Sequence, residues 1–470
     1  MTNQRVYDTN EGRPAPAHGQ GLLGAIPELA SDPLGLTLKL LDYDAPVVEL
    51  KLPFRHIAVV LDADIYHQIL SPAHKTFTKD ERSVDILGAV LGNGIVTNRD
   101  IQSHRTHRKL IQPGFHFRRL QDYAAIMADY TRLYLSDWGD SQVRDISNDM
   151  YKLTMFIVCK TLFDIDMESM ADEAAEIGEA MDRLQEQTQK RYASPVYFPS
   201  SVPTPRNLRL MQGRRVLHKT VKQMFSERSR SGLAGKERGD LMTMLLEARY
   251  DDGSAMSDGQ IMDELVTLFS AGHETTSNAL SWTFYLLATH PEIREKLQAE
   301  TDQVLAGSDA SFDDLGELKY TEMVIKESMR ILPPVWTLNM RNAQLDTEIN
   351  GLRFPKGKRV WLSPYGLHHS PQYFSNPSRF DPERFSEENE KSIPRHAYSP
   401  FGLGPRTCIG NSFAMMEAKL ILATIIQRFD VELGTDDPFA PQPQITLSNS
   451  GGMPLRVSKR SAPRPASLSA

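Results

Sequence analysis

The chain has 470 residues, of which 24% are charged and 40% hydrophobic, and this balance is typical of a globular protein rather than a disordered or fibrous one. The formal net charge is −7 and the pI is near 6.0, which argue against nucleic acid as a partner because that function requires a basic surface. The two cysteines, Cys159 and Cys408, are too few for a disulfide framework. We therefore expect two free thiols and a reducing, cytoplasmic location.

The N-terminal segment is polar and charged, without the apolar stretch of a signal peptide. No run approaches the roughly 20 apolar residues of a spanning helix, so we expect no membrane anchor. Glycine and proline are dense in residues 12–35 and predict irregular structure there, so residues 1–35 are expected to form a surface lead-in. Residues 36–460 are expected to form one domain, followed by a polar tail at 461–470.

The order of predicted elements indicates the fold class. Residues 47–52 and 57–61 predict a hairpin, followed by a helix from about Asp64. From about residue 100 to 299 the periodicity is helical, broken by loops at 195–205 and 229–239. After residue 330, prolines mark turns among short strands, before a helix from Asn411 to Arg428. This pattern predicts a mainly α protein with a smaller β-rich lobe, an α+β fold.

One predicted helix is unusually long. It begins after the cap residue Ser257 and ends at His290, before a proline, so at ~1.5 Å per residue it spans on the order of 50 Å. In its middle, Glu274 and Thr275 interrupt an apolar stripe. We expect Gly272 to permit a local widening and threonine hydroxyls to bond back to carbonyls, which together would open a pocket for a small ligand. A polar patch that faces solvent is the simpler alternative.

A second unusual segment is Phe-Gly-Leu-Gly-Pro-Arg-Thr-Cys-Ile-Gly at 401–410, which places Cys408 in a glycine-rich loop directly before a helix. Glycines allow backbone to approach a flat cofactor closely. Backbone N–H groups and the start of the helix would stabilise a thiolate, and Arg406 adds a cation for an anionic group. A lone cysteine more often packs in a core, which is our expectation for Cys159.

This segment resembles the haem-binding signature of the cytochrome P450 family, Phe-x-x-Gly-x-Arg-x-Cys-x-Gly, with Phe401, Arg406, Cys408 and Gly410 at fixed positions. The resemblance extends over roughly residues 20–460. It implies the cytochrome P450 fold, with haem b between the long central helix and the helix after the cysteine loop, and with Cys408 as the ligand of the haem iron. It also implies that Glu274 and Thr275 deliver protons when O2 is activated.

The resemblance assigns further residues. Glu327 and Arg330 share one helical face, and with Arg384 they are expected to form a buried structural network. The haem propionates are expected to bind cations and a histidine, namely His104, Arg108, Arg341 and Arg406. A ferredoxin or flavodoxin-type donor, which passes on electrons from NAD(P)H, is expected to dock on a basic patch, namely Arg105, Lys109, Arg118 and Arg119. We expect no reductase domain on this chain.

The implied activity is that of an oxidoreductase, a monooxygenase that inserts one oxygen atom from O2 into a lipophilic small molecule such as a fatty acid, terpenoid or polyketide. The expected pocket residues are mostly apolar: Val84, Ile86, Leu87, Leu268, Ala271, Val335, Trp336, Leu338 and Leu447. One alternative is a peroxide-driven hydroxylase or decarboxylase of the same family, which would not need Glu274 and Thr275. The other is a haem-binding sensor without catalysis, which would also gain nothing from that pair.

Overall fold

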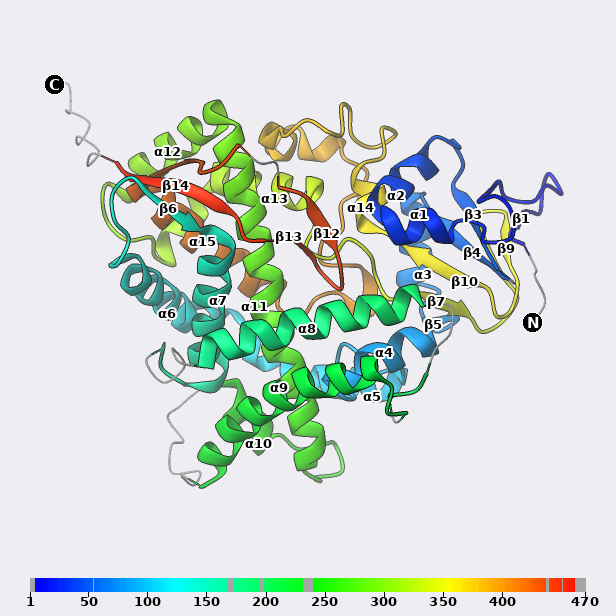
Figure 1. Cartoon of the computed structure of the whole chain (residues 1–470), viewed down its shortest axis with the longest axis horizontal. Helices are drawn as coiled ribbons and strands as arrows, with labels where there is room; N and C mark the ends of the chain where they lie inside the picture. Colours follow the sequence, from blue (N-terminus) through cyan, green and yellow to red (C-terminus); the bar gives the residue numbers. More distant parts are fainter. Residues whose placement is uncertain are drawn as a thin grey trace.

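The computed structural model describes residues 5–53, 55–167, 173–194, 198–200, 202–230, 240–436, 439–449 and 451–460. Helices make up most of the molecule, and the strands β1–β5 and β7–β10, which come from both halves of the chain, gather in a smaller lobe at one end (Figure 1). The predicted class, mainly α with a β-rich lobe, is confirmed.

The helices give the molecule its bulk. Two predicted helices, α11 and α15, have the expected bounds. Those of α11 follow from strong local signals, because the Ser257 side chain caps its first turn and a proline follows its end. In chain order the helices are α1 Ile26–Ser31, α2 Pro33–Leu41, α3 Ala63–Leu70, α4 Glu81–Leu91, α5 Ile101–Ile111, α6 Phe117–Leu135, α7 Ile146–Phe163, α8 Glu173–Ala193, α9 Pro205–Arg230, α10 Leu241–Glu247, α11 Asp258–Thr289, α12 Pro291–Leu305, α13 Lys319–Ile331, α14 Pro364–His368 and α15 Asn411–Arg428.

The strands form four small sheets, in the orders β2-β3-β4-β10-β7-β5, β1-β9-β8, β11-β14-β6 and β12-β13. In chain order they are β1 Tyr7–Asp8, β2 Ala17–His18, β3 Val47–Leu52, β4 Arg55–Val60, β5 Phe77–Lys79, β6 Gln142–Asp145, β7 Arg341–Ala343, β8 Thr347–Ile349, β9 Leu352–Phe354, β10 Arg359–Leu362, β11 Phe429–Leu433, β12 Pro441–Pro443, β13 Leu447–Asn449 and β14 Pro454–Lys459. The predicted β3–β4 hairpin is present. In the largest sheet, β5 pairs with β7 so that Lys79 lies opposite Arg341.

The lead-in differs from its prediction. Irregular structure was expected at residues 12–35, but residues 26–31 form α1 and Pro33 opens α2. Pro27 and Pro33 each stand in a first helical turn, where proline favours a helix start instead of a loop. Ala25 and Leu34 are buried in the core beneath the β lobe. The domain boundary at residue 35 stays a prediction. The expected tail at 461–470 lies outside the described residues, as does most of the loop expected at 229–239; of the loop expected at 195–205, residues 198–200 and 202–204 are described and are irregular, as predicted.

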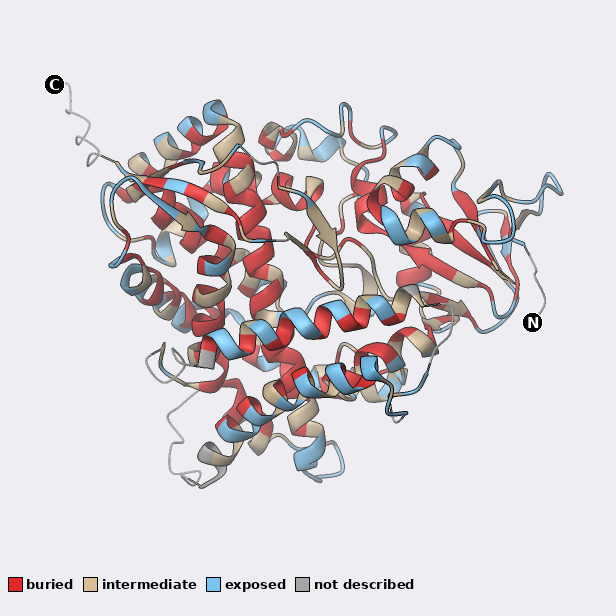
Figure 2. Cartoon of the chain, viewed as in Figure 1, coloured by how far each residue is buried: buried red, intermediate tan, exposed pale blue. Residues whose placement is uncertain are grey.

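Helix α11 is the centre of the helical part. It runs through the molecule and is buried over most of its length (Figures 1 and 2). It packs against α7, and a Cβ placed on Gly272 would lie 3.2 Å from a methyl carbon of Val158 on α7. The helix is continuous at this point, so the expected widening at Gly272 is wrong. The glycine instead allows the two helices to approach closely.

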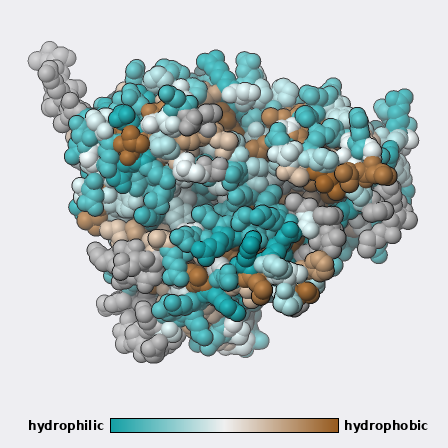
Figure 3. Space-filling view, viewed as in Figure 1, coloured by the Kyte–Doolittle hydropathy of each residue, from teal (hydrophilic) through white to brown (hydrophobic). Residues whose placement is uncertain are grey.

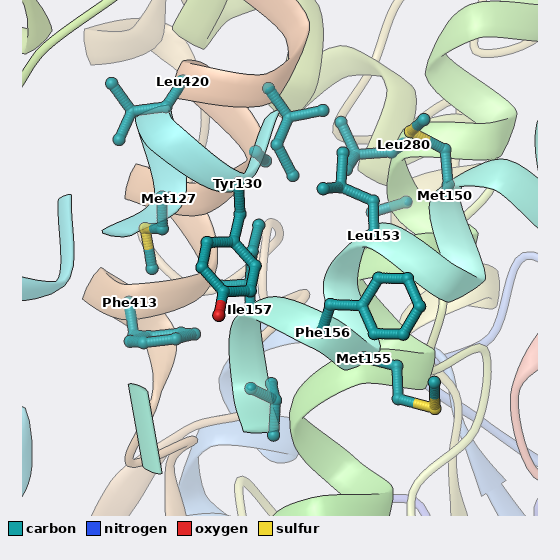
Figure 4. Close-up of a cluster of buried hydrophobic side chains, with 14 of the residues drawn as sticks. Met127, Tyr130, Met150, Leu153, Met155, Phe156, Ile157, Leu280, Phe413 and Leu420 are labelled. Carbon is teal, nitrogen blue, oxygen red and sulfur yellow. The ribbon is translucent and has the colours of Figure 1, made fainter. Parts of the chain in front are cut away.

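Apolar side chains of α6, α7, α11 and α15 fill the space between these helices (Figure 4). Met127, Phe156, Leu280 and Phe413 each come from a different one of them and meet in this core. The outer face over α8 and α9 is largely hydrophilic (Figure 3). Within the described ranges, no helix combines the length and the apolar character that crossing a bilayer requires.

Candidate active site

The loop that carries Cys408 is held by its own backbone. The Cys408 N–H donates a hydrogen bond of 2.9 Å to the Phe401 carbonyl. Gly402 and Gly404 have φ of +68° and +73°, a region that other residues avoid. A Cβ on Gly404 would lie 2.2 Å from the Leu70 carbonyl oxygen at the end of α3, so this glycine allows the loop to reach α3.

The Cys408 thiol faces a space inside the molecule. The residue keeps accessible surface, whereas Cys159 is buried in the core between the helices. Burial nevertheless raises the pKa of the Cys408 thiol, while the Gly410 N–H and the Arg108 guanidinium oppose this rise. A sulfur that is accessible but surrounded by protein lines an internal space. The start of α15, which Gly410 caps, adds its partial positive charge on the side of the sulfur.

Helix α11 also has accessible surface in the middle of its buried length. Ala271 is exposed and Thr275 is half-buried, while the neighbouring Glu274 is buried. Ala271 and Thr275 lie one turn apart on one face, and the Thr275 hydroxyl donates to the Ala271 carbonyl at 2.9 Å. Helices α11 and α15 are in contact at this level, where the Thr276 hydroxyl lies beside the Glu417 carboxyl. Helix α11 and the helix after Cys408 are therefore neighbours at the level of Thr275.

Four cationic side chains lie near the Cys408 loop, and the hydrogen bonds that they donate all go to backbone carbonyls. Lys79 donates to Val96, Arg108 to Thr407 at 2.7 Å, Arg341 to Asn339 and Arg406 to Asn98 at 2.8 Å. Within the part of the chain that the structure describes, none of the four forms an ion pair. One cavity is lined by Lys79, Arg341 and Arg406 together.

The electrostatics of this cluster favour an anionic ligand. Burial, together with the nearby Arg406, Lys79 and Arg108, lowers the pKa of His104 to about 3, so His104 is neutral. Burial also lowers the pKa of Arg406 to about 10, and burial with the nearby Arg406 lowers that of Arg341 to about 10. Buried charges are normally paired. Carboxylates brought by a ligand would supply the missing partners.

Lys79 is the cation that sequence reasoning missed. It is a lone lysine in a three-residue strand, and nothing in its local sequence distinguishes it from a surface lysine. Only the pairing of β5 with β7, across more than 260 residues, places it opposite Arg341. Burial lowers its pKa well below the usual value, and Arg406 and Arg341 lower it further.

Glu274, the acid beside Thr275, is hydrogen-bonded to the side chain of Thr446. Burial raises the pKa of the Glu274 carboxyl to about 7; a hydrogen bond from Thr446 opposes this rise, and Asp182 adds to it. The Thr446 hydroxyl lies 2.5 Å from Glu274 Oε1, and the Asn278 amide donates to the Thr446 oxygen at 3.1 Å. Thr446 and Asn278 were not predicted, because only the folded chain brings the segment after β12 to α11.

The structure brings Glu327, Arg330 and Arg384 together. Arg330 donates to both carboxylate oxygens of Glu327, at 2.7 and 2.8 Å, and both side chains are fully buried. Arg384 donates to Glu327 Oε1 at 3.2 Å. Arg330 also donates to the His368 carbonyl at 2.8 Å, so the group joins α13 to the end of α14.

The expected pocket residues divide by exposure. Ala271 is exposed, Val84, Val335 and Leu338 are half-buried, and Ile86, Leu87, Leu268, Trp336 and Leu447 are buried. Leu447 and the segment that begins at Pro334 are joined, because the Leu447 N–H donates to the Pro334 carbonyl at 2.8 Å.

The expected docking residues lie mostly at the surface. Arg105, Lys109 and Arg118 are exposed and Arg119 is half-buried. Lys109 forms an exposed ion pair of 2.7 Å with Asp251. His104 and Arg108 point inward from the same helix, so α5 presents one face to the interior and another to solvent.

These residues fit a haem. The accessible Cys408 sulfur is a ligand for iron, Gly402 and Ala271 leave room for a flat macrocycle, and the buried cations suit its two carboxylates. Fold and site together define a haem-thiolate protein.

The comparisons with known proteins agree. The cytochrome P450 family model matches residues 14–454. Cyclooctat-9-en-7-ol 5-monooxygenase of Streptomyces melanosporofaciens is 38% identical over 342 residues, 72% of this chain and 73% of the relative. Cyclooctatin synthase of the same organism is 34% identical over 87% of this chain and 88% of the relative. Pentalenene oxygenase of Streptomyces avermitilis is 31% identical over 84% and 86%.

The chain belongs to the cytochrome P450 family. It is a haem-dependent monooxygenase that uses O2.

Proposed function

We propose that this monooxygenase inserts one oxygen atom into a lipophilic terpenoid and receives its electrons from NAD(P)H through a separate ferredoxin or flavodoxin-type protein. The observation that carries the proposal is the pair on α11: the Thr275 hydroxyl on the accessible face and the buried Glu274 carboxyl next to it. An alcohol and an acid on adjacent residues can pass protons from the interior to a reacting group.

Each residue has a role that follows from its position. Cys408 would hold the iron as thiolate, and Lys79, Arg108, Arg341 and Arg406 would hold the propionates. When bound, the haem supplies the oxidising chemistry with dioxygen. Thr275 Oγ1 would hold a proton on the accessible face. Glu274, with a pKa raised to about 7, can both take up and release a proton near neutral pH.

The substrate class is drawn from the relatives and from the lining. Two Streptomyces relatives are named for the oxidation of cyclooctat-9-en-7-ol and of pentalenene, compounds of terpenoid type. The candidate pocket residues Val84, Ala271, Val335 and Leu338 keep some accessible surface and are all apolar. A largely hydrocarbon substrate suits such a lining better than a charged one. Among fatty acid, terpenoid and polyketide, we therefore favour terpenoid.

The electron donor is proposed to dock on Arg105, Lys109, Arg118 and Arg119. Three of these side chains are exposed, and α5, which carries the first two, also carries Arg108, which donates to the backbone of the Cys408 loop. An acidic carrier protein would be attracted to this surface and would sit close to the thiolate side of the haem.

The test is turnover by the purified holoenzyme with a ferredoxin, its reductase and NAD(P)H. Compounds are first screened by the change of the Soret band on binding, and the reduced protein with carbon monoxide should give the red-shifted band of a thiolate-ligated haem. Thr275→Ala should lower product yield at least roughly tenfold, because the hydroxyl that positions the proton is lost.

Thr276→Ala is the matched control, because Thr276 is buried beside Thr275 and lies off the accessible face. An unshifted band with carbon monoxide would refute the thiolate assignment. Product formation with peroxide alone, insensitive to Thr275→Ala, would establish the peroxide-driven alternative. Ligand binding without product from any donor would establish the sensor.

A further inference from the structure

The Glu274 carboxyl is held by a residue from a distant part of the chain. Thr446 lies in the turn between β12 and β13, and its hydroxyl is 2.5 Å from Glu274 Oε1. Both side chains are buried. Figure 1 shows the β12–β13 hairpin beside α11, between the helical part and the β lobe.

The pattern of donors fixes the direction of this hydrogen bond. Asn278, one turn after Glu274 on α11, donates its amide hydrogen to the Thr446 oxygen at 3.1 Å. Gln185 Oε1 on α8 lies 3.2 Å from the same oxygen. A threonine hydroxyl has one proton, and the shorter contact is to the carboxylate, so Thr446 donates to Glu274 when this acid is ionised.

The hairpin itself is fixed on two sides. The Leu447 N–H donates to the Pro334 carbonyl at 2.8 Å, and the indole N–H of Trp282 on α11 donates to the Leu447 carbonyl at 2.8 Å. Pro334 begins the segment that contains Val335 and Leu338, two of the proposed pocket residues. A backbone bond thus connects a proposed pocket wall to Leu447, the neighbour of Thr446, and the Thr446 side chain contacts the acid.

Other ionisable groups near Glu274 do not favour its charged form. Asp182 on α8 raises the pKa of Glu274, and the half-buried Tyr151 on α7, whose hydroxyl is buried, also faces it. Among the described residues, no cation pairs with this carboxyl. The Thr446 hydroxyl and the Asn278 amide behind it are therefore what stabilises the carboxylate.

We propose that Thr446 is a positioning residue for Glu274, and that the β12–β13 hairpin thereby couples the seating of substrate to proton delivery. A substrate that presses on the Pro334–Leu338 segment would shift the hairpin through Leu447. The Thr446 hydroxyl would then move relative to the carboxyl and change how readily Glu274 holds its proton. This coupling rests on the proposed function, but the bond between Thr446 and Glu274 does not.

The experiment measures the titration of Glu274 directly. In the holoenzyme, the infrared band of the protonated carboxyl is followed against pH and is assigned by its disappearance in Glu274→Gln. Thr446→Val should move the titration midpoint up by roughly one pH unit, because a hydrogen bond to the charged form is lost. Thr446→Ser keeps the hydroxyl and should leave the midpoint near that of the unmodified protein. Thr446→Ala replaces the valine variant if that one does not fold.

Turnover supplies the second readout. The product formed per NAD(P)H consumed should fall several-fold in Thr446→Val and recover in Thr446→Ser. Substrate binding should move the Glu274 midpoint in the unmodified protein but not in Thr446→Val. A midpoint that is equal in Thr446→Val and the unmodified protein overturns the positioning role, even where turnover is normal. A midpoint that moves as expected, in a protein that oxidises nothing, upholds the positioning role and refutes the proposed function instead.

Discussion

Glu417 is a buried acid whose carboxyl oxygens lack a well-aligned hydrogen-bond donor among the described residues. It is fully buried on α15. Burial raises its pKa well above the usual 4.5, against a weaker opposing contact with Thr276. An acid whose pKa is raised in the folded state stabilises the fold at low pH. This contribution is lost as pH rises from about 4.5 through the folded-state pKa.

We therefore expect Glu417→Gln to be more resistant to urea than the unmodified protein at about pH 8, since the variant has no proton to lose. The difference should disappear below pH 4.5, where the acid is protonated in both states. Glu432→Gln, at an exposed position of β11, is the control and should change little at either pH. A glutamine variant that is less stable at the higher pH would contradict this prediction.

Lys79 gives a second prediction at the scale of one residue. If it binds a propionate, Lys79→Met should speed the release of haem to a scavenger protein by roughly tenfold or more, because one charged hydrogen bond is lost. The haem-free variant should instead unfold at a higher temperature, since a buried cation among other cations is removed. Lys75→Met, at an exposed position four residues earlier, should change neither quantity.

At the scale of elements, the Cys408 loop depends on two glycines for different reasons. Gly402 and Gly404 both have positive φ, but only Gly404 would bring a Cβ against another backbone, that of Leu70. Gly402→Ala should cost only the strain of the left-handed conformation, roughly 1–2 kcal/mol. Gly404→Ala should cost more and should displace the loop. The measure is the fraction of protein that gives the red-shifted band with carbon monoxide. Equal losses in the two variants would show that the contact with α3 is unimportant.

Elements with strong local signals were predictable from sequence, and those that depend on pairing were not. Helix α11 has a serine cap at its start and a proline beyond its end, so its bounds follow from short-range chemistry. The stretch around Pro27 and Pro33 was misjudged, because proline breaks a helix interior but favours its first turn.

The candidate site shows the same division. Cys408, Glu274 and Thr275 stand within short motifs and could be found in the sequence. Lys79 and Thr446 could not, because Lys79 meets Arg341 and Thr446 meets Glu274 only through folding, across 262 and 172 positions of the chain. Their local sequences contain a lone lysine in a strand and a threonine in a turn, and both patterns are common on protein surfaces.

At the scale of the whole molecule, the site depends on contacts that fix distant segments of the chain relative to one another. The buried group of Glu327, Arg330 and Arg384 is one place where this happens. Glu327 accepts hydrogen bonds from its own helix, through Arg330, and from the segment 381–384, through the Asp381 N–H at 2.9 Å and Arg384 at 3.2 Å. Arg330 in turn binds the carbonyl of His368 at 2.8 Å. A single carboxylate thus joins α13 to the chain that leads toward the Cys408 loop.

Glu327→Gln should therefore destabilise the whole protein, because it leaves the buried Arg330 guanidinium without its counter-charge. The expected loss is about 3–5 kcal/mol in the free energy of unfolding. Glu322→Gln is the matched control on the same helix: the Glu322 side chain is 39% exposed, so the loss of its ion pairs with Lys326 and Lys419 should cost less than the loss of the fully buried Glu327. Urea unfolding of both holoenzyme variants, followed by circular dichroism and by the Soret band together, measures the difference. If Glu327 joins the segments as its contacts indicate, the two signals should be lost together and at lower urea in Glu327→Gln, and a loss no larger than that of Glu322→Gln would contradict the prediction.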